Sequence, residues 1–338
     1  MIYLSVRYNI GYFIDYGIWE QAIKLLDQQM NLRNSKKIQV HNYLNFRYFN
    51  KVRAQYNKII DSKEYFNKRI KNNFFYGLTN EFFTYEYGKL KDNFGIRNYL
   101  FISYPLMLVH YSIGIYLLKL SQGFMDDIRF HYKDVKGYKV KSYYGGDLRI
   151  EKGNLLFEKP FYRLYYKDHY DDFKDGVKQE LKDSKNKVVL KIDIENYYDN
   201  ISIEKLCGLL DGNIDWATKN KLNFNEYTID QICFFYEFVM KDRTGIPQSD
   251  NNIISGLIGY LYLLFADIAI LDEIRNCNID YSKIIRYVDD IYLVIKYIDD
   301  LDSYEALRGN SMNILSRVID LLYYAFGLKI NSKTKVLL

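Results

Sequence analysis

Apolar and polar residues alternate through the C-terminal half of the chain in a pattern that predicts strands and helices in turn. Short runs of β-branched and apolar residues are typical of buried strands, whereas apolar residues that recur every three or four positions are typical of helices. The pattern predicts strands over 187–193 and 327–337, a hairpin over 283–297, helical segments to about 240, and helices over 202–210, 252–275 and 303–325. This order indicates an α+β fold in which helices pack on one face of an antiparallel sheet.

The N-terminal half shows a weaker pattern. Apolar residues have helical spacing in places, and residues 121–175 are rich in turn-forming and charged residues. Within that stretch Gly-Gly-Asp at 145–147 is predicted to form the tip of a hairpin. We therefore divide the chain into a mostly helical region over 1–95, a second region over 96–186 and a third over 187–338.

Two apolar stretches invite comparison with membrane-spanning helices. Residues 98–118 carry no formal charge and approach the length that spans a bilayer, but they include Pro105, His110 and several Tyr residues. Residues 253–265 are equally apolar, and Asp267 interrupts their continuation. Both stretches are expected to be core helices that are apolar on all sides because they are buried, so no membrane association is predicted.

Composition places the chain among globular proteins. Its 338 residues are 49% hydrophobic and 26% charged, which suffices for a large core and excludes a disordered scaffold. The 47 Lys and Arg residues are interleaved with 36 Tyr and 21 Phe, a mixture that suits contacts with nucleic-acid phosphates and bases. An AT-rich genome would give similar residue frequencies, so this support is weak. Cys207, Cys233 and Cys277 form no Cys-x-x-Cys pair and predict buried thiols in a reducing compartment, the cytoplasm.

Carboxylates stand at two predicted strand ends. Asp289 and Asp290 occupy the turn of the predicted hairpin, and Asp193 stands where the strand 187–193 ends. Adjacent aspartates repel each other, and apolar flanking strands solvate them poorly, so a cation is expected to compensate their charge. Mg²⁺ is the expected ion, because it prefers oxygen ligands and leaves positions open for phosphate oxygens. An ordinary polar turn would explain the pair at 289–290 alone, but the second acidic strand end argues against it.

Four segments of the chain, in this order, resemble the conserved palm motifs of reverse transcriptases. They are residues 193–201, Gly-Ile-Pro-Gln at 245–248, Tyr-Val-Asp-Asp at 287–290, and Gly-Leu-Lys-Ile-Asn-Ser-Lys-Thr at 327–334. The chain resembles a bacterial reverse transcriptase, and residues 97–105 are similar to the fingers entry of abortive-infection and related defence-associated reverse transcriptases. The resemblance implies a right-hand polymerase with a fingers-like region over 96–186 and a ferredoxin-like palm sheet over 187–338.

The resemblance also implies roles for individual residues. Asp193, Asp289 and Asp290 are the expected catalytic carboxylates, and together with Ile194 they are the residues expected to bind two Mg²⁺ ions.

Three further residues are implied to bind the nucleotide. Tyr198 corresponds to the aromatic ring that lies under the sugar and excludes a 2′-hydroxyl, which favours dNTPs over NTPs. Gln248 corresponds to a residue that contacts the incoming nucleotide near its sugar, and Lys333 to one that protonates or steadies the leaving pyrophosphate. Simple packing of Tyr198 and an ordinary solvated Lys333 are the alternatives.

The chain departs from the family pattern in two places. After Pro-Gln the family usually has Gly and, a few residues later, Ser at the start of a helix, so Ser255 corresponds to that serine only if about two residues are inserted. No complete thumb is evident after Lys333. We expect a protein partner, a second copy of the chain or a structured RNA to supply the grip on the duplex, unless the chain is truncated.

The function implied by the resemblance is RNA-directed DNA synthesis in the cytoplasm. The expected partners are dNTPs, an RNA template or an associated non-coding RNA, and a DNA product. Similarity to abortive-infection enzymes implies antiviral defence, with untemplated and protein-primed synthesis both left open. Two alternatives remain: a palm that binds RNA or a partner without catalysis, and a nucleotidyltransferase that uses NTPs.

Overall fold

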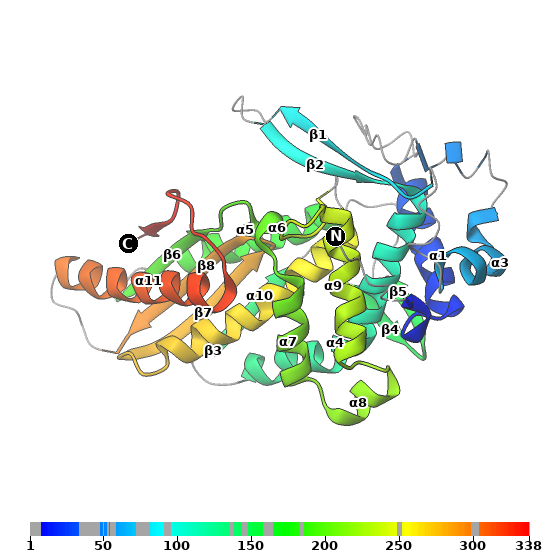
Figure 1. Cartoon of the computed structure of the whole chain (residues 1–338). Coiled ribbons are helices and arrows are strands. Elements are labelled where there is room, and N and C mark those ends of the chain that lie inside the picture. Colours follow the sequence, from blue (N-terminus) through cyan, green and yellow to red (C-terminus); the bar gives the residue numbers. More distant parts are fainter. Residues whose placement is uncertain are drawn as a thin grey trace. The chain divides into compact units, whose positions relative to one another are not determined.

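The chain forms a mixed α+β structure, as the sequence predicts (Figure 1). The computed structural model describes residues 8–33, 48–49, 51–52, 54, 59–71, 81–90, 96–134, 138–143, 148–157, 165–182, 186–248, 252–298 and 304–337. The chain divides into two compact units. Unit 1 comprises Met1–Ser121, Leu148–Arg163 and Leu210–Ser255, and unit 2 comprises Gln122–Asp147, Leu164–Leu209 and Gly256–Leu338. The three sequence regions proposed above stay a prediction.

Unit 1 is mainly helical. Its elements are η1 (Ile10–Tyr12), α1 (Tyr16–Arg33), η2 (Ile59–Asp61), α3 (Lys63–Tyr65), η3 (Phe66–Ile70), β1 (Thr84–Leu90), β2 (Ile96–Ile102), the first part of α4 (Tyr104–Asp134), β4 (Leu148–Glu151), β5 (Asn154–Phe157), α8 (Trp216–Lys221) and α9 (Glu226–Met240). The N-terminal segment is tied to α9, because the backbone N–H of Asn9 donates to Gln231 at 2.9 Å. Tyr116 of α4 donates to the carbonyl of Leu222 at 3.1 Å.

Two short hairpins belong to unit 1, β1–β2 and β4–β5. The β4–β5 turn consists of Lys152 and Gly153, whose φ angles of 49° and 79° suit a tight two-residue hairpin. The predicted hairpin with its tip at 145–147 is wrong, because the flanking strands have other partners: β3 (Tyr138–Tyr143) pairs with β7, and β4 pairs with β5. Residues 145–147 themselves lie outside the described residues.

A five-stranded sheet forms the core of unit 2. Its strand order is β3-β7-β8-β6-β9, from β6 (Lys187–Asp193), β7 (Ile279–Tyr287), β8 (Asp290–Tyr297) and β9 (Lys335–Leu337). Only β3 runs parallel to its neighbour, and the other pairs are antiparallel. The remaining elements of unit 2 are α5 (Tyr165–Lys182), α6 (Tyr197–Asn200), most of α7 (Ile203–Asn213) and of α10 (Ile253–Ile274), and α11 (Tyr304–Phe326).

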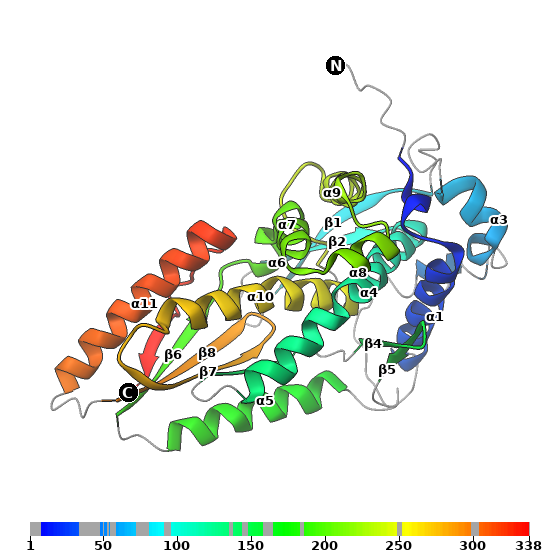
Figure 2. The same cartoon turned by 90° about the horizontal axis from the view of Figure 1, so that it is seen from below.

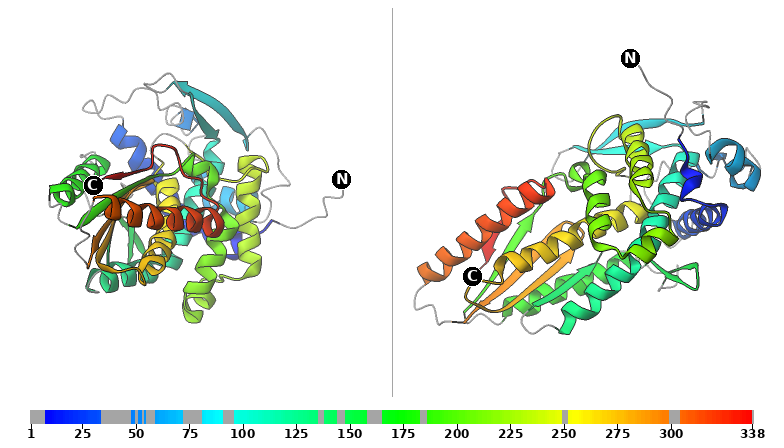
Figure 3. Two further views of the ribbon diagram at one scale, coloured as in Figure 1. Left: turned by 90° about the vertical axis from the view of Figure 1, so that its left-hand side faces the viewer. Right: turned by 60° about the horizontal axis from the view of Figure 1, so that its bottom comes forward.

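Helices cover both faces of this sheet. The helices predicted for the C-terminal half, α10 and α11, pack together as predicted, with Tyr262 of α10 donating to the carbonyl of Phe326, whereas the opposite face is covered by α5, which precedes that half of the chain. Successive residues of a strand point to opposite faces. On β7, Ile285 packs in one cluster with Phe173 of α5, whereas the next residue, Arg286, is paired with Asp267 of α10. Figure 2 and the right panel of Figure 3 accordingly show β7 and β8 between α5 and α10. This arrangement could not be predicted, because the apolar stripe of α5 does not indicate which face of the sheet the helix will cover.

The other predicted elements of the C-terminal half have mixed outcomes. The strand 187–193, the hairpin, and the helices that became α7, α10 and α11 are confirmed to within a few residues. The strand over 327–337 is shorter than predicted: only 335–337 form β9, and Ile330 adds an isolated bridge to Ile194. Residues 331–334 turn instead, with the N–H of Thr334 donating to the carbonyl of Asn331 at 3.0 Å.

The two apolar stretches are part of the core. Residues 98–118 are divided between β2 and the buried start of α4. Among the described helices, α10 is the one long and apolar enough to cross a membrane, with a mean hydropathy of 2.0, but 89% of that window is buried inside the protein. This burial is what a core helix of a soluble protein shows, and the cytoplasmic location stays a prediction. Cys207 is a buried free thiol as predicted, whereas Cys233 and Cys277 are free but only half-buried.

Candidate functional site

Two acidic strand ends meet in the sheet of unit 2. Asp193 is the last residue of β6, Asp290 is the first of β8, and the two are directly opposite each other in the antiparallel pair. The Cβ atoms of such partners lie about 4.5–5.5 Å apart and their side chains point to the same face. Asp289 precedes Asp290 in the turn between β7 and β8. The structure thus brings together the strand ends that carry all three predicted carboxylates.

The charge around Asp290 is only partly balanced. Burial raises the pKa of its half-buried carboxyl, and the neighbouring charge of Asp193 also raises it. Lys191 and Lys333 lower the pKa of Asp290, so both ammonium groups are close enough to compensate some of the acidic charge. Lys333 is therefore near Asp290. Its side chain is exposed, and its role toward pyrophosphate stays a prediction.

The carboxylates suit a hard divalent cation, since oxygen ligands on two neighbouring strands would lose their mutual repulsion on binding it. Ile194 is buried, and only its backbone carbonyl could serve as a ligand. Within the described part of the chain, no three His, Cys, Asp or Glu side chains already gather as a metal site. The fit to Mg²⁺ therefore rests on the pair Asp193 and Asp290, with Asp289 beside it in the turn.

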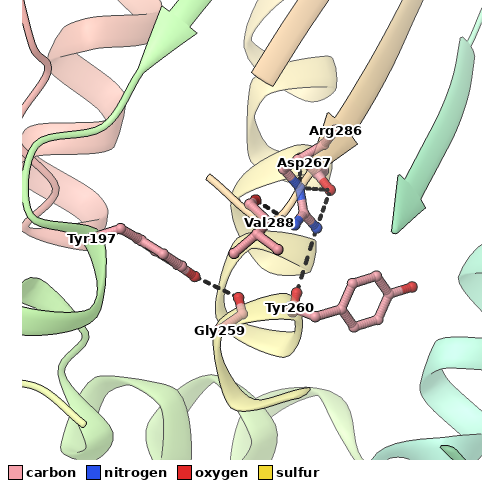
Figure 4. A network of polar contacts seen from close by, with 6 residues as sticks. All are labelled: Tyr197, Gly259, Tyr260, Asp267, Arg286 and Val288. Carbon is pink, nitrogen blue, oxygen red and sulfur yellow. Dashed lines mark hydrogen bonds and ion pairs between the residues drawn. The ribbon is translucent and has the colours of Figure 1, made fainter. Parts of the chain in front are cut away.

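The turn that carries Asp289 has an unusual backbone. Tyr287 and Asp290 are paired, so Val288 and Asp289 form a two-residue turn. Val288 has φ of 52°, in the left-handed region that β-branched residues rarely adopt. Its carbonyl accepts a hydrogen bond of 3.0 Å from Nη1 of Arg286 (Figure 4).

Arg286 is held in turn by a buried carboxylate. Its Nε lies 3.1 and 3.2 Å from the two oxygens of Asp267, and its Nη2 lies 2.9 Å from Oδ2. Nη2 also lies 3.4 Å from the carbonyl of Tyr260. Arg286 and Asp267 are both fully buried. In the sequence, Asp267 stands out as a charge within an apolar helix and Arg286 as the residue before the paired-aspartate motif, but nothing there indicates that the two form a pair.

The predicted sugar-contacting ring lies beside a buried tyrosine. Tyr198 is half-buried, and its ring centroid is 5.4 Å from that of Tyr197. The hydroxyl of Tyr197 donates to the carbonyl of Gly259 in α10 at 2.5 Å (Figure 4). Burial raises the pKa of Tyr197 well above its usual value, which keeps that donor protonated. Tyr197 and Gly259 are site residues that the sequence left unassigned.

Gly259 leaves room for both rings. A Cβ at this position would lie 3.0 Å from Cε1 of Tyr197 and 3.5 Å from Cε1 of Tyr198. Carbon atoms in ordinary contact are about 3.5–4.0 Å apart. The absence of a side chain at Gly259 therefore sets how closely the tyrosines approach α10.

Gln248 belongs to unit 1, and the other predicted site residues belong to unit 2. Its carbonyl accepts a hydrogen bond of 2.9 Å from the N–H of Leu100 in β2. The preceding carbonyl, of Pro247, accepts one of 2.6 Å from the hydroxyl of Ser255. Both bonds fix the backbone around Gln248, and its contact with a nucleotide stays a prediction.

A buried histidine supports this segment. His110 lies 3.2 Å from Ser255 Oγ through Nε2 and 3.0 Å from the Tyr236 hydroxyl through Nδ1. Ser255 has one hydroxyl proton, and the carbonyl of Pro247 can only accept, so that proton goes to Pro247 and Nε2 of His110 donates to Ser255. Nδ1 then accepts from Tyr236. Burial lowers the pKa of His110 to about 3, which agrees with this neutral ring.

In comparisons with known proteins, no family model and no curated protein matches the chain.

Proposed function

We propose that the protein is a reverse transcriptase, an RNA-directed DNA polymerase that adds dNTPs to a primer hydroxyl, and that unit 2 contains its palm. The observation that carries the proposal is the register of Asp193 and Asp290 at neighbouring strand ends, with Asp289 in the adjacent turn. Two-metal phosphoryl transfer requires carboxylates from neighbouring segments that can share a pair of ions. The order of the four motif segments along the chain supports the same proposal.

The topology of unit 2 also supports a palm. The elements β6, α10, β7, β8, α11 and β9 follow a βαββαβ order, and their strands lie in the sheet as β9-β6-β8-β7. This is the ferredoxin-like arrangement on which polymerase palms are built. The strand β3 and the helices α5, α6 and α7 are additions to it. The right-hand architecture, with a fingers-like region over 96–186, is part of the proposal.

The predicted carboxylates, Tyr198 and Gln248 have distinct tasks in this reaction. Asp193, Asp289 and Asp290 would hold two Mg²⁺ ions, which when bound activate the primer hydroxyl and neutralise the triphosphate. Tyr198 would exclude NTPs by contact with the 2′-hydroxyl, and Gln248 would orient the sugar. The protein thus contributes position and charge rather than a nucleophile of its own.

The proposed partners follow from the same resemblance. They are an RNA template or an associated non-coding RNA, a DNA product, and a protein partner or a second copy of the chain. The proposed setting is antiviral defence of the abortive-infection type in the bacterial cytoplasm.

The first test is nucleotide incorporation. Purified protein, with the nucleic acid that copurifies, is incubated with Mg²⁺ and labelled dNTPs, singly and together, beside Asp289→Ala. Asp280→Ala is the matched control, because Asp280 is an exposed carboxylate on the same hairpin whose ion pair with Lys296 is also exposed. Incorporation by the wild type and the control, lost in Asp289→Ala, would support the proposal.

Other outcomes of this experiment favour the alternatives. Equal use of NTPs and dNTPs by the wild type would favour a general nucleotidyltransferase, and a Tyr198→Ala variant that leaves dNTP preference unchanged would remove the sugar-contact role. Retained nucleic acid without incorporation by any variant would favour a palm that binds RNA without catalysis. Dependence on one dNTP or on all four separates untemplated addition from copying.

A further inference from the structure

One helix holds both segments that carry the candidate site. Two consecutive carbonyls of α10, those of Gly259 and Tyr260, accept hydrogen bonds from Tyr197 and from Arg286 respectively. Tyr197 precedes the predicted sugar-contacting Tyr198, and Arg286 lies three residues before Asp289. Asp267, two turns further along α10, accepts hydrogen bonds from Nε and Nη2 of the same guanidinium (Figure 4).

The stability of the fold does not by itself explain the buried pair of Arg286 and Asp267. Both side chains are fully removed from water, and apolar residues of similar volume often replace such a pair with no loss of stability. An apolar pair could not donate a hydrogen bond to the carbonyl of Val288, which Arg286 does at 3.0 Å. What the ion pair provides and an apolar pair would not is therefore this hydrogen bond to the turn at Val288.

The turn needs such a bond. A two-residue hairpin turn normally has Gly, Asn or Asp where the chain requires a positive φ, and here the position is Val288, with φ of 52°. A conformation of this kind persists only when surrounding contacts determine it. Within the described residues, Arg286 provides the side-chain hydrogen bond to the carbonyl of Val288, and Asp267 fixes the guanidinium from the opposite side.

We propose that Arg286 and Asp267 are positioning residues that hold the Val288 turn so that Asp289 is presented beside Asp193 and Asp290, and that α10 keeps this turn in register with Tyr197 and Tyr198. The role of the turn in catalysis rests on the proposed polymerase function. The conformational part, that the ion pair determines the backbone at Val288, stands without it. Tyr197 links the two segments, because its environment includes both Arg286 and Asp289.

The test replaces the pair without leaving a charge behind. The double variant Asp267→Leu/Arg286→Met keeps the buried volume and removes the donor to Val288, and Arg286→Lys keeps the charge but removes the fork of donors. Lys283→Met is the matched control: Lys283 lies on β7 three residues before Arg286, and its partner Glu180 keeps a second ion pair with Lys187. Melting temperature and hydrogen exchange of the Val288 and Asp289 amides are measured for each, together with kcat and KM for dNTP.

We expect the double variant to melt within a few degrees of the wild type while the two turn amides exchange about tenfold faster or more. kcat should fall roughly 100-fold, as expected for misplaced reacting groups, with KM changed little. Lys283→Met should resemble the wild type in exchange and kcat. A merely structural role would lower the melting temperature without this separation of kcat from KM.

Two results would overturn the inference. One is a folded double variant with wild-type exchange at 288–289, and the other is loss of folding in both the double variant and Arg286→Lys, which would make the pair a requirement of folding. Faster exchange with unchanged kcat in an active enzyme would overturn the catalytic part. If the wild type incorporates no nucleotide, the polymerase proposal and the catalytic part fail, and hydrogen exchange alone still decides the conformational part.

Discussion

Replacing Gly259 by Ala adds one methyl group between α10 and the two tyrosines. The new Cβ would lie 3.0 Å from Cε1 of Tyr197 and 3.3 Å from its hydroxyl oxygen. Normal contacts between carbon atoms begin at about 3.5 Å, so the ring must move by roughly 0.5 Å. Tyr197 is buried, and its hydroxyl is bonded to the carbonyl of the residue being changed. The ring therefore has little freedom to move away.

The size of the effect follows from two opposing contributions. Overpacking a well-packed core costs about 1–3 kcal/mol, whereas Gly to Ala inside a helix stabilises by about 0.8–1 kcal/mol. Gly309 separates the two, because it lies exposed inside α11 and an added Cβ there meets nothing within 4 Å. Gly309→Ala shows the helix contribution alone. The unfolding free energy of Gly259→Ala should therefore be lower than that of Gly309→Ala by the overpacking cost, about 1–3 kcal/mol.

Thermal unfolding of the wild type and both variants measures this difference. At about 2–4 °C per kcal/mol, Gly259→Ala should melt roughly 2–12 °C below Gly309→Ala. Gly309→Ala should itself melt slightly above the wild type. A Gly259→Ala variant that melts at or above Gly309→Ala would show that the tyrosines are not packed against this glycine, and the reasoning on both rings would be wrong.

Substitutions at three further positions test other contacts. Tyr197→Phe removes the bond to Gly259 and should cost about 0.5–1.5 kcal/mol in urea unfolding; an unchanged midpoint would contradict that bond. His110 is neutral in the fold, with a pKa lowered by burial to about 3, so the unfolded chain binds the extra proton and stability should fall by about 1.4 kcal/mol per pH unit below about 6.5. His110→Gln should flatten this dependence in urea titrations at several pH values, and equal slopes would exclude it. Asn225 caps α9 by accepting from the N–H of Thr228 at 3.1 Å; Asn225→Ala should cost about 1 kcal/mol in thermal unfolding and Asn225→Ser much less, so equal losses would count against the cap.

Local sequence patterns predicted the elements that bear the carboxylates but not what supports them. The runs that became β6 and the hairpin β7–β8 are bounded by turn residues, so the positions of Asp193 and Asp289 at strand ends could be predicted. The partners of Arg286 could not, since Asp267 is on a helix and a hydrogen bond between distant segments leaves no periodic signal.

The misplaced elements have a similar cause. The end of the chain was predicted as one strand over 327–337, but Asn331 turns the backbone and its side chain accepts from the N–H of Lys333 at 3.1 Å. Asn and Ser favour such local bonds over a sheet ladder. The strand β3 pairs with β7, far away in sequence, and so the turn-rich residues after β3 misled the local prediction.

The strand order has a consequence for the chain as it leaves the ribosome. β6 is made well before either of its neighbours, since β8 begins at Asp290 and β9 at Lys335. Until then, both edges of this largely apolar strand lack their final partners, a state in which strands pair with other chains. Unit 2 also waits for its third segment, Gly256–Leu338, whereas unit 1 is complete once Ser255 has emerged. The sheet of unit 2 can therefore form only after Gly256–Leu338 has emerged, and β6 must be kept from pairing with other chains until then.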